Sequence, residues 1–506
     1  MKVNRYLILL FFIFFAIIIL LLPFKYLLHY SVDDSYFYIK TANNFAGGLG
    51  STFDTINKTN GYHPLWFILL SIYYFIIHLL KFTSPELIYR YTFLLSSLLN
   101  LISLYLLFQF YKNIFGKSNV YVFIIIIPLL LSFSLFHVIG LESQLLILLL
   151  SLYIFYDTIK INNLNYLIKA IILGLIVITR LDLIIFTYPI IIFYEIIKER
   201  NYSIPNKIKN YQLLIITPLI FYLFYELANY IGFSSLLTIS GKIKFSVLNF
   251  LFWKNIPNIH EYPINFFLLS INISSGIIYY TLIKKNYLLK DKIKNFRIIE
   301  YLYWSGNLFL LFHFCFNNQG VRLWYYAFPN FISLILVSPM ILLLKKIRTL
   351  LISVSVIILI LFLTLFRINY YNSDDEYSYA LKMKKIVSKG ENVFQVDYTG
   401  IIGFYSERNV INGDGLINSF EYYKYLQNNN LKSYFKKLNI KYYSTISFNP
   451  IIVKDYFYDS VYHPDGLTLK FPIKNIVIKC QKIYGGIFRK RYGWFYLIKI
   501  DGSNLF

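Results

Sequence analysis

An apolar segment runs directly into two adjacent acidic residues in MKVNRYLILLFFIFFAIIILLLPFKYLLHYSVDDSYFY, residues 1–38. Residues 6–24 are almost entirely apolar, and a helix needs about 20 such residues to cross the hydrocarbon core of a bilayer. This apolar run is too long for a signal peptide and no small-residue cleavage site follows it, so we expect a retained transmembrane helix. Asp33 and Asp34 are therefore predicted to lie at a membrane surface.

The rest of the chain is similarly apolar. Of its 506 residues, 57% are hydrophobic and 15% are charged, whereas about a quarter of the residues of a soluble domain are charged. Segments that are long enough or nearly long enough to cross a membrane lie near residues 6–28, 88–110, 120–136, 143–158, 164–178, 183–197, 211–230, 263–283, 298–316, 328–344 and 349–366. The sequence predicts an α-helical polytopic membrane protein with about eleven transmembrane helices.

The basic residues indicate the orientation of these helices. The net charge is +24, but the Lys and Arg residues gather in short loops at 198–209, 284–297 and 345–348 rather than along one polar face. This distribution argues against a nucleic acid partner, and the positive-inside rule places the three loops and the N-terminus in the cytoplasm. The assignment requires the apolar stretch 64–80 to be a juxtamembrane or re-entrant helix within a long first external loop, residues 29–87.

The pattern changes after residue 366. Short apolar runs alternate with polar turns, with strand-like segments at 392–398 and 410–412 and a helical segment at 419–438. We therefore expect a transmembrane domain at 1–366 and an extracytoplasmic α/β domain at 367–506. The two cysteines, Cys315 and Cys480, predict neither a disulfide framework nor a cysteine-based metal site.

The acidic pair has two interpretations. A carboxylate at the membrane surface can act as a general base. Alternatively, Ser31 caps a short helix and Asp34, three residues later, completes a variant of the capping box. The spacing alone favours neither interpretation.

The order of the features after the first crossing resembles the GT-C superfamily of glycosyltransferases that use lipid-linked sugars, which includes protein O-mannosyltransferases and the aminoarabinose transferases of lipid A. The resemblance rests on the pair Asp33-Asp34, a helical stretch at 36–46 and a glycine-containing turn at 47–50. It is sharpest between residues 33 and 66, with weaker similarity at 140–142 and 179–182.

This resemblance implies an inverting glycosyltransferase of the plasma (inner) membrane. Its partners would be a polyprenyl phosphate-linked sugar donor, an acceptor hydroxyl on a glycan, lipid or protein at the extracytoplasmic face, and the surrounding membrane lipids. By resemblance Asp33 is the expected base, with Asp34 as the second choice. Glu142 is expected to orient the acceptor or to share a cation with Asp33, although an acidic residue is also favoured at a helix N-terminus.

Four cations are predicted at the outer boundary, where Lys and Arg are otherwise scarce: Arg90, Arg180, Lys242 and Arg322. Any of them could bind the donor phosphate, and we prefer Arg90 and Lys242. The alternative for each is interfacial snorkelling without a ligand. Asp182 could pair locally with Arg180, but only if the helix is broken there, because residues two apart do not face each other on a regular helix.

Tyr62, His63 and Trp66 complete the candidates for substrate binding. Since Pro64 follows His63, a structural role for His63 at a helix start is the stronger interpretation. The sequence contains no P-loop, dinucleotide fingerprint or H-E-x-x-H motif, so we expect no organic cofactor. A divalent cation held by carboxylates alone remains an open alternative, and the turn at 413–416 has no assigned catalytic role.

Two other classes of protein compete with the enzyme. Charges near the membrane also mark the paths of lipid or solute transporters. We find no paired halves with matching broken helices, and the long external loop and domain are unexpected in a transporter. A membrane scaffold with an external binding domain is the third possibility.

Overall fold

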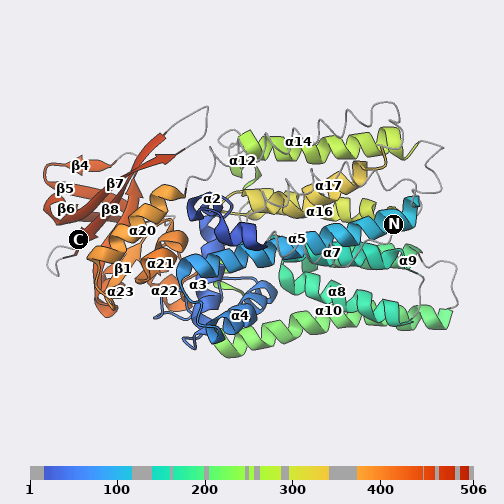
Figure 1. Ribbon diagram of the computed structural model, residues 1–506, viewed down its shortest axis with the longest axis horizontal. Coiled ribbons are helices and arrows are strands. Elements are labelled where there is room, and N and C mark those ends of the chain that lie inside the picture. Colours follow the sequence, from blue (N-terminus) through green and yellow to red (C-terminus); the bar gives the residue numbers. More distant parts are fainter. Residues whose placement is uncertain are drawn as a thin grey trace.

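The structure is a computed structural model in which a long bundle of helices adjoins a smaller region of strands and helices (Figure 1). It describes residues 16–116, 139–159, 163–198, 204–245, 250–255, 263–285, 296–340, 373–447, 450–461, 467–484 and 491–500. The predicted crossings at 120–136 and 349–366 and the predicted domain boundary at 367 lie outside these residues.

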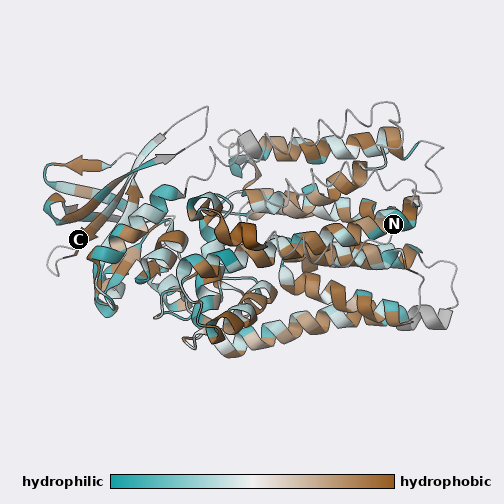
Figure 2. Cartoon of the chain, viewed as in Figure 1, coloured by the Kyte–Doolittle hydropathy of each residue, from teal (hydrophilic) through white to brown (hydrophobic). Residues whose placement is uncertain are grey.

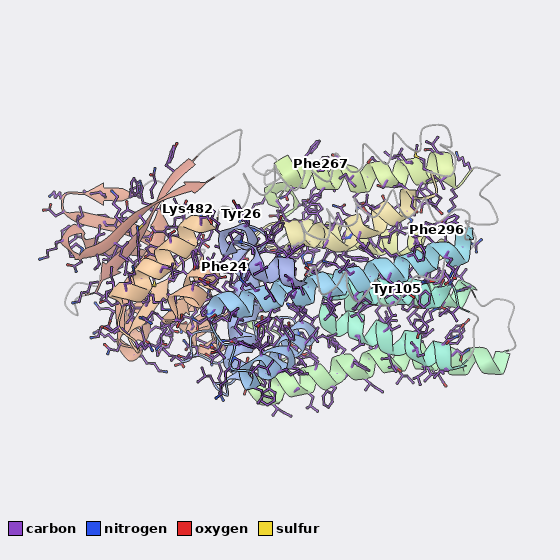
Figure 3. The ribbon with its side chains drawn as sticks, viewed as in Figure 1. Phe24, Tyr26, Tyr105, Phe267, Phe296 and Lys482 are labelled. Atoms are coloured by element: carbon purple, nitrogen blue, oxygen red, sulfur yellow. The ribbon has the colours of Figure 1, made fainter. Side chains whose placement is uncertain are left out.

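The bundle consists of apolar helices that lie side by side. These helices are α5 (Pro85–Phe115), α7 (Ser143–Asp157), α8 (Asn163–Thr179), α9 (Leu183–Lys198), α10 (Ile204–Phe233), α14 (Pro263–Ile278), α16 (Arg297–Phe316) and α17 (Ala327–Val337). Figure 2 shows that their surfaces are mainly hydrophobic, and exposed side chains such as Tyr105 and Phe267 project from them (Figure 3). Among the described residues, three helices are long and apolar enough to cross a membrane: Pro85–Phe115, Asn210–Phe233 and Asn265–Ile283. The chain is therefore a membrane protein, while the count of eleven crossings is not established.

The predicted first crossing, residues 6–28, is wrong as a continuous helix. Within its described part, the helix is interrupted at Pro23 and resumes as α2 (Phe24–Leu28). Proline has no N–H, so the carbonyl of Ile19, four residues earlier, loses its helical partner. The Arg90 side chain of α5 replaces that donor, because its Nη1 lies 2.6 Å from the Ile19 oxygen. The same guanidinium also lies over the Phe24 ring.

Two short helices follow the first crossing and pack against each other: α3 (Asp33–Ala46) and α4 (Pro64–Leu79). As predicted, α4 begins after an extended His63, with Pro64 in its first turn. The alternative interpretation of Ser31 as the start of a capping box is wrong, because the residue preceding α3 is Val32. The Ser31 hydroxyl instead donates to the Ile139 carbonyl at 2.8 Å and contacts the Tyr89 hydroxyl.

The C-terminal region is α/β, as predicted. Its five-stranded sheet has the order β2-β1-β3-β8-β7 and its second sheet the order β4-β5-β6. The strands are β1 (Asn392–Gln395), β2 (Asn409–Asn412), β3 (Ile440–Ser447), β4 (Ile451–Val453), β5 (Tyr456–Val461), β6 (Leu467–Pro472), β7 (Ile476–Tyr484) and β8 (Arg491–Lys499). Strand β1 is parallel to β2 and β3, and β8 is antiparallel to β3 and β7.

The helices of this region are α20 (Asp374–Ile386), α21 (Thr399–Ser406), α22 (Phe420–Gln427) and α23 (Leu431–Lys437). The single helix predicted at 419–438 is wrong, because α22 and α23 are separated by a turn in which Asn429 has a φ of 51°. The strand predicted at 392–398 ends at Gln395. Short elements complete the described chain: α11 (Ile239–Lys244), α12 (Phe252–Asn255), η2 (Tyr279–Ile283), η4 (Leu323–Tyr326) and η6 (Ile473–Asn475).

The topology can be tested with fused reporters. Helix α4 has 16 residues and is about 24 Å long, shorter than the roughly 30 Å hydrocarbon core. We therefore expect reporters near Tyr62 and after Phe506 to be active outside the cytoplasm and a reporter near Lys290 to be active inside. A cytoplasmic reporter after Phe506 would mean that residues 64–80 cross the membrane.

Candidate active site

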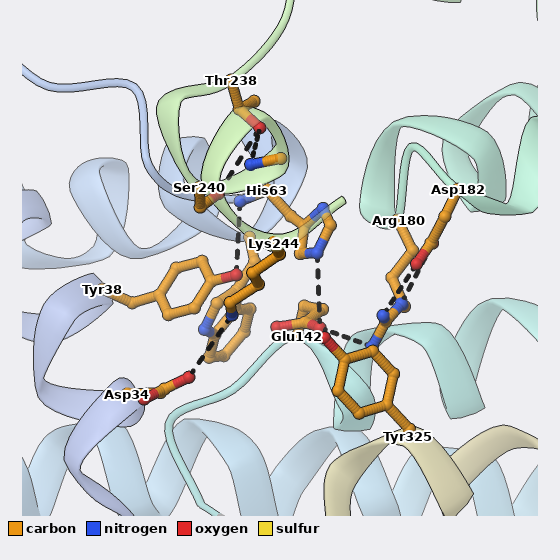
Figure 4. Close-up of polar contacts among 12 residues, drawn as sticks. Asp34, Tyr38, His63, Glu142, Arg180, Asp182, Thr238, Ser240, Lys244 and Tyr325 are labelled. Carbon is orange, nitrogen blue, oxygen red and sulfur yellow. Dashed lines mark hydrogen bonds and ion pairs between the residues drawn. The ribbon is translucent and has the colours of Figure 1, made fainter. Parts of the chain in front are cut away.

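A polar cavity lies at the end of the helical bundle that adjoins the C-terminal region. Its walls come from α3, the loop before α4, the loop before α7, the α8–α9 connection, α11 and η4 (Figure 4). The turn before α22 completes them through Leu416. The lining residues are Asp34, Phe37, Tyr38, Gly61, Tyr62, His63, Leu141, Glu142, Arg180, Ser240, Lys244, Trp324, Tyr325 and Leu416. Five of the predicted site residues therefore meet here: Asp34, Tyr62, His63, Glu142 and Arg180.

Asp34 and Lys244 face each other across the cavity. The Lys244 Nζ lies 3.8 Å from the Asp34 Oδ2, and their side chains are 17% and 25% exposed. Burial opposes the charged form of Lys244, but Tyr325, Asp34 and other acidic groups outweigh burial and raise its pKa. A positive charge and a partly exposed carboxylate are thus available at the same opening.

The position of Lys244 follows from the way α11 begins. The Thr238 hydroxyl accepts a hydrogen bond from the Gly241 N–H at 3.1 Å, which caps the N-terminus of the helix. The side chain of Asn60 accepts from the Ile239 N–H at 2.9 Å and donates to the Asn229 side chain at 2.8 Å. These bonds attach α11 to the loop that precedes α4, so Lys244 is placed by contacts far apart in the sequence.

A buried ion network forms the rear wall of the cavity. The Arg180 Nη1 lies 3.0 Å from the Glu142 Oε1, and its Nη2 lies 2.9 Å from the Asp182 Oδ2. The Asp182 Oδ2 is also 3.1 Å from the His313 Nε2. Arg180 and Asp182 lie between the end of α8 and the start of α9, which confirms the predicted pairing across a helix break. Because burying a lone guanidinium is costly, the two carboxylates stabilise it there.

His63 extends this network toward the opening. Its Nε2 lies 3.8 Å from the Glu142 Oε1, and its backbone N–H donates to the Tyr38 hydroxyl at 3.2 Å. Burial lowers the pKa of His63, although the charge of Glu142 opposes this effect. His63 is therefore a neutral imidazole at neutral pH.

The two adjacent aspartates have different partners. Whereas Asp34 lines the cavity, the carboxylate of Asp33 accepts from the backbone N–H of Gly400 at 3.0 Å and of Ile401 at 2.8 Å. Both of these donors belong to α21 of the C-terminal region. On a helix, neighbouring side chains point about 100° apart, which allows the pair to face different surfaces.

The other predicted residues lie outside the cavity lining. Arg90 binds the Ile19 carbonyl, and Lys242 packs over the rings of Phe420 and Tyr423. Trp66 is fully buried and donates from its indole N–H to the Gly140 carbonyl at 2.7 Å. Arg322 is exposed, and its charge acts on Asp397.

Sequence reasoning missed several lining residues. Lys244 is two positions from Lys242, one of the two cations preferred as phosphate contacts, and the sequence alone does not show which of the two lysines faces the cavity. No sequence motif or charge pattern indicated that Tyr38, Ser240 or Tyr325 would line a site. Leu416 belongs to the turn that had no assigned role, and its carbonyl closely approaches Gly61, where an added Cβ would lie 2.0 Å from that oxygen.

A shared divalent cation does not fit the described residues. No group of three His, Cys, Asp or Glu side chains among them is arranged to hold a metal ion. Asp33 faces α21, and the carboxylates of Asp34 and Glu142 each lie near a basic side chain. The arrangement in this part of the chain therefore suits proton transfer and anion binding.

Two solved structures share the overall fold, in which a helical bundle adjoins an α/β region. The crystal structure of ArnT from Cupriavidus metallidurans bound to undecaprenyl phosphate matches with a TM-score of 0.57 and 9% identity, over 98% of each chain. The apo structure of the same protein matches with a TM-score of 0.52 and 8% identity, again over 98% of each chain.

ArnT is a lipid A aminoarabinose transferase, so the GT-C resemblance predicted from residues 33–66 is confirmed for the fold. No family model matches the sequence, and no curated protein matches it. At 9% identity the similarity establishes the fold alone, and the activity has to be inferred from the site.

The turn that carries Leu416 should respond to pH through Asp414. Burial raises the pKa of Asp414 to about 7, and the charges of Asp397 and Asp34 add to this effect. An unfolded Asp has a pKa near 3.9, so the stability that Asp414 contributes is present below about pH 4 and is lost as pH rises through about 7.

Asp414→Asn should remove this loss, because Asn can still accept from the Leu416 N–H that Asp414 binds at 2.8 Å. The melting temperature of the variant minus that of the wild type, measured in detergent, should therefore rise between pH 5 and pH 8. A constant difference across this range would contradict the assigned environment of Asp414.

Proposed function

We propose that the chain is an inverting membrane glycosyltransferase, which transfers a sugar from a polyprenyl phosphate-linked donor to an acceptor hydroxyl at the extracytoplasmic face. The observation that carries this proposal is the Asp34–Lys244 pair, which places a base and a cation at one opening in front of a buried ion network. The fold shared with ArnT, which was solved with undecaprenyl phosphate bound, supports the choice of donor.

In the proposed reaction, Asp34 accepts the proton of the acceptor hydroxyl as the oxygen attacks the anomeric carbon. The bond between that carbon and the phosphate oxygen breaks, and the polyprenyl phosphate leaves with the bonding electrons. Attack from the side opposite the leaving group inverts the anomeric configuration. Because the donor carries its own leaving group, the protein has only to position the reactants, take one proton and stabilise the phosphate.

Lys244 is the proposed contact for the phosphate. The Lys244 ammonium is 3.8 Å from Asp34, and the phosphodiester of the donor, which carries one negative charge, would compete with Asp34 for it. The arriving donor would thereby release Asp34 to act as a base. Arg180 also lines the cavity, but it already pairs with Glu142 and Asp182, so its charge is mostly neutralised and its role is to orient Glu142.

Glu142 and His63 are proposed to hold the acceptor. Glu142 presents a carboxylate that is fixed by Arg180, and His63 lies beside it as a neutral imidazole that can donate or accept a hydrogen bond. Tyr62 and Trp324 supply apolar surface at the opening. A cavity that combines these groups suits a hydroxylated acceptor better than a simple ion.

The transporter remains the second candidate, since charged groups at a membrane surface could bind a solute before it is moved. A transporter would consume no donor, whereas the proposed enzyme releases free polyprenyl phosphate in proportion to the sugar transferred. Measurement of this release separates the two classes.

Asp34→Asn should reduce transfer by about 100- to 10,000-fold, the usual contribution of a general base. The amide has nearly the same shape but no useful proton affinity. The measurement is the release of undecaprenyl phosphate from a panel of undecaprenyl phosphate sugars by protein in membrane vesicles. Asp374→Asn in α20 removes one carboxylate outside the cavity lining and should keep full activity. Full transfer by Asp34→Asn would remove the proposed base.

The phosphate contact can be tested with two lysines that differ by two positions. Lys244→Met should weaken binding of undecaprenyl phosphate by about 10- to 100-fold, since a hydrogen bond to a charged group is worth about 1.5–3 kcal/mol. Lys242→Met should change it by less than about threefold, because Lys242 packs on aromatic rings of the C-terminal region. The measurement is the protection of each variant against thermal unfolding by added undecaprenyl phosphate. Equal losses in the two variants would contradict the assignment.

A further inference from the structure

Side chains of α3 form hydrogen bonds near both ends of α21, a helix of the C-terminal region. Asp33 and Lys40 are seven residues apart, so they lie on the same side of α3. Asp33 accepts the N–H groups of Gly400 and Ile401, and the Lys40 Nζ donates to the carbonyls of Gly403 at 2.7 Å and Arg408 at 3.2 Å. We refer to these contacts as the α3–α21 clamp.

The clamp complements the charges at the ends of α21. The first four N–H groups and last four carbonyls of a helix have no partner within it, and the helix dipole makes its N-terminus positive and its C-terminus negative. The residue before α21, Tyr398, makes no side-chain cap hydrogen bond. Asp33 therefore supplies from another helix the cap that α21 does not supply itself, and Lys40 serves the opposite end.

The two helices can make these contacts because Gly400 lets them approach, while Gly403 lets α21 lie close to the loop that follows α3. A Cβ added to Gly400 would lie 2.1 Å from the Asp33 carbonyl oxygen, and one added to Gly403 would lie 2.8 Å from the Phe53 ring. Between the ends, Tyr36 packs edge-on against Tyr405 at 5.4 Å between ring centroids. The clamp is thus a close-packed joint that a single methyl group would disturb.

The clamp also bears on the cavity. Asp33 precedes Asp34 in the first turn of α3, so a rotation of α3 that releases Asp33 would also turn Asp34 away from Lys244. The region that carries α21 also supplies Leu416 to the cavity wall. One joint therefore holds the position of the carboxylate and of the turn opposite to it.

We propose that Asp33 is a positioning residue, which couples the seating of the C-terminal region on α3 to the orientation of Asp34. This inference rests on the proposed function of Asp34. Asp33 acts through α21, because its two oxygens are directed to N–H donors there, whereas Asp34 lines the cavity. The acidic pair thus combines one base with one interdomain contact.

The test opens the clamp without changing a carboxylate. Gly400→Ala should expose the C-terminal region to trypsin in detergent and lower kcat for sugar transfer about 2- to 30-fold, the range expected for a damaged helix cap. Its matched control is Gly232→Ala in α10, where an added Cβ would meet no atom within 4 Å. If Gly400→Ala does not accumulate, Lys40→Met opens the other end and should have the same effects.

The two aspartates are then compared in the same assays. Asp33→Asn keeps one acceptor for α21, so transfer should fall by no more than about 30-fold, protection from trypsin should weaken, and the pH profile of kcat should keep its shape. Asp34→Asn should lower the rate of sugar transfer by about 100- to 10,000-fold, while the C-terminal region stays as resistant to trypsin as in the wild type.

Three results would overturn parts of this account. A loss of more than about 100-fold in Asp33→Asn with intact protection would make Asp33 the base. Wild-type protection and transfer in both Gly400→Ala and Lys40→Met would refute the clamp. Full transfer in Asp34→Asn would refute the proposed function and with it the coupling, whereas loss of trypsin protection in Gly400→Ala would still support the clamp as the joint between the two regions.

Discussion

The candidate site depends on a guanidinium that is buried where α8 ends. Arg180 joins the loop before α7 through Glu142, the α8–α9 connection through Asp182, and α16 through the contact of Asp182 with His313. Removing one partner from such a network would leave an uncompensated buried charge, which typically costs 3–5 kcal/mol. The helix ends that surround the cavity are therefore fixed to one another before any substrate binds. Asp34 and Lys244 line the same cavity, whose rear wall is this network.

Much of the helical region could be predicted because membrane helices are specified by local apolarity. The segments near 143–158, 164–178 and 183–197 correspond to α7, α8 and α9, and the break at Arg180 was expected from its pairing with Asp182. The errors arose where a single residue ends a helix although the residues on both sides of it have a composition that favours a continuous helix. Pro23 interrupts the first crossing, and the turn at Asn429 divides one predicted helix into two.

The cations of the site could be predicted only in part, because a cation near a membrane can serve a ligand, a ring or a backbone carbonyl. Arg90 is used to replace the N–H that Pro23 lacks, which is a structural role without a sequence motif. Lys242 and Lys244 differ by about 200° around a helix, so the choice between them depends on where α11 begins. Asn60 and Thr238 set that start, and no spacing in the sequence connects residue 60 to residue 239.

The acidic pair shows how one short motif can serve two surfaces. The side chains of two successive residues on a helix diverge by about 100°, so they can reach different surfaces. Asp34 lines the opening between the bundle and the C-terminal region, whereas Asp33 lies at the N-terminus of α21, a favourable site for a carboxylate. With α21 lying against α3, the Asp33 side chain accepts two backbone N–H groups of α21 and thereby joins the two regions. The different roles proposed for Asp33 and Asp34 thus rest on their different partners, the backbone of α21 for Asp33 and Lys244 for Asp34.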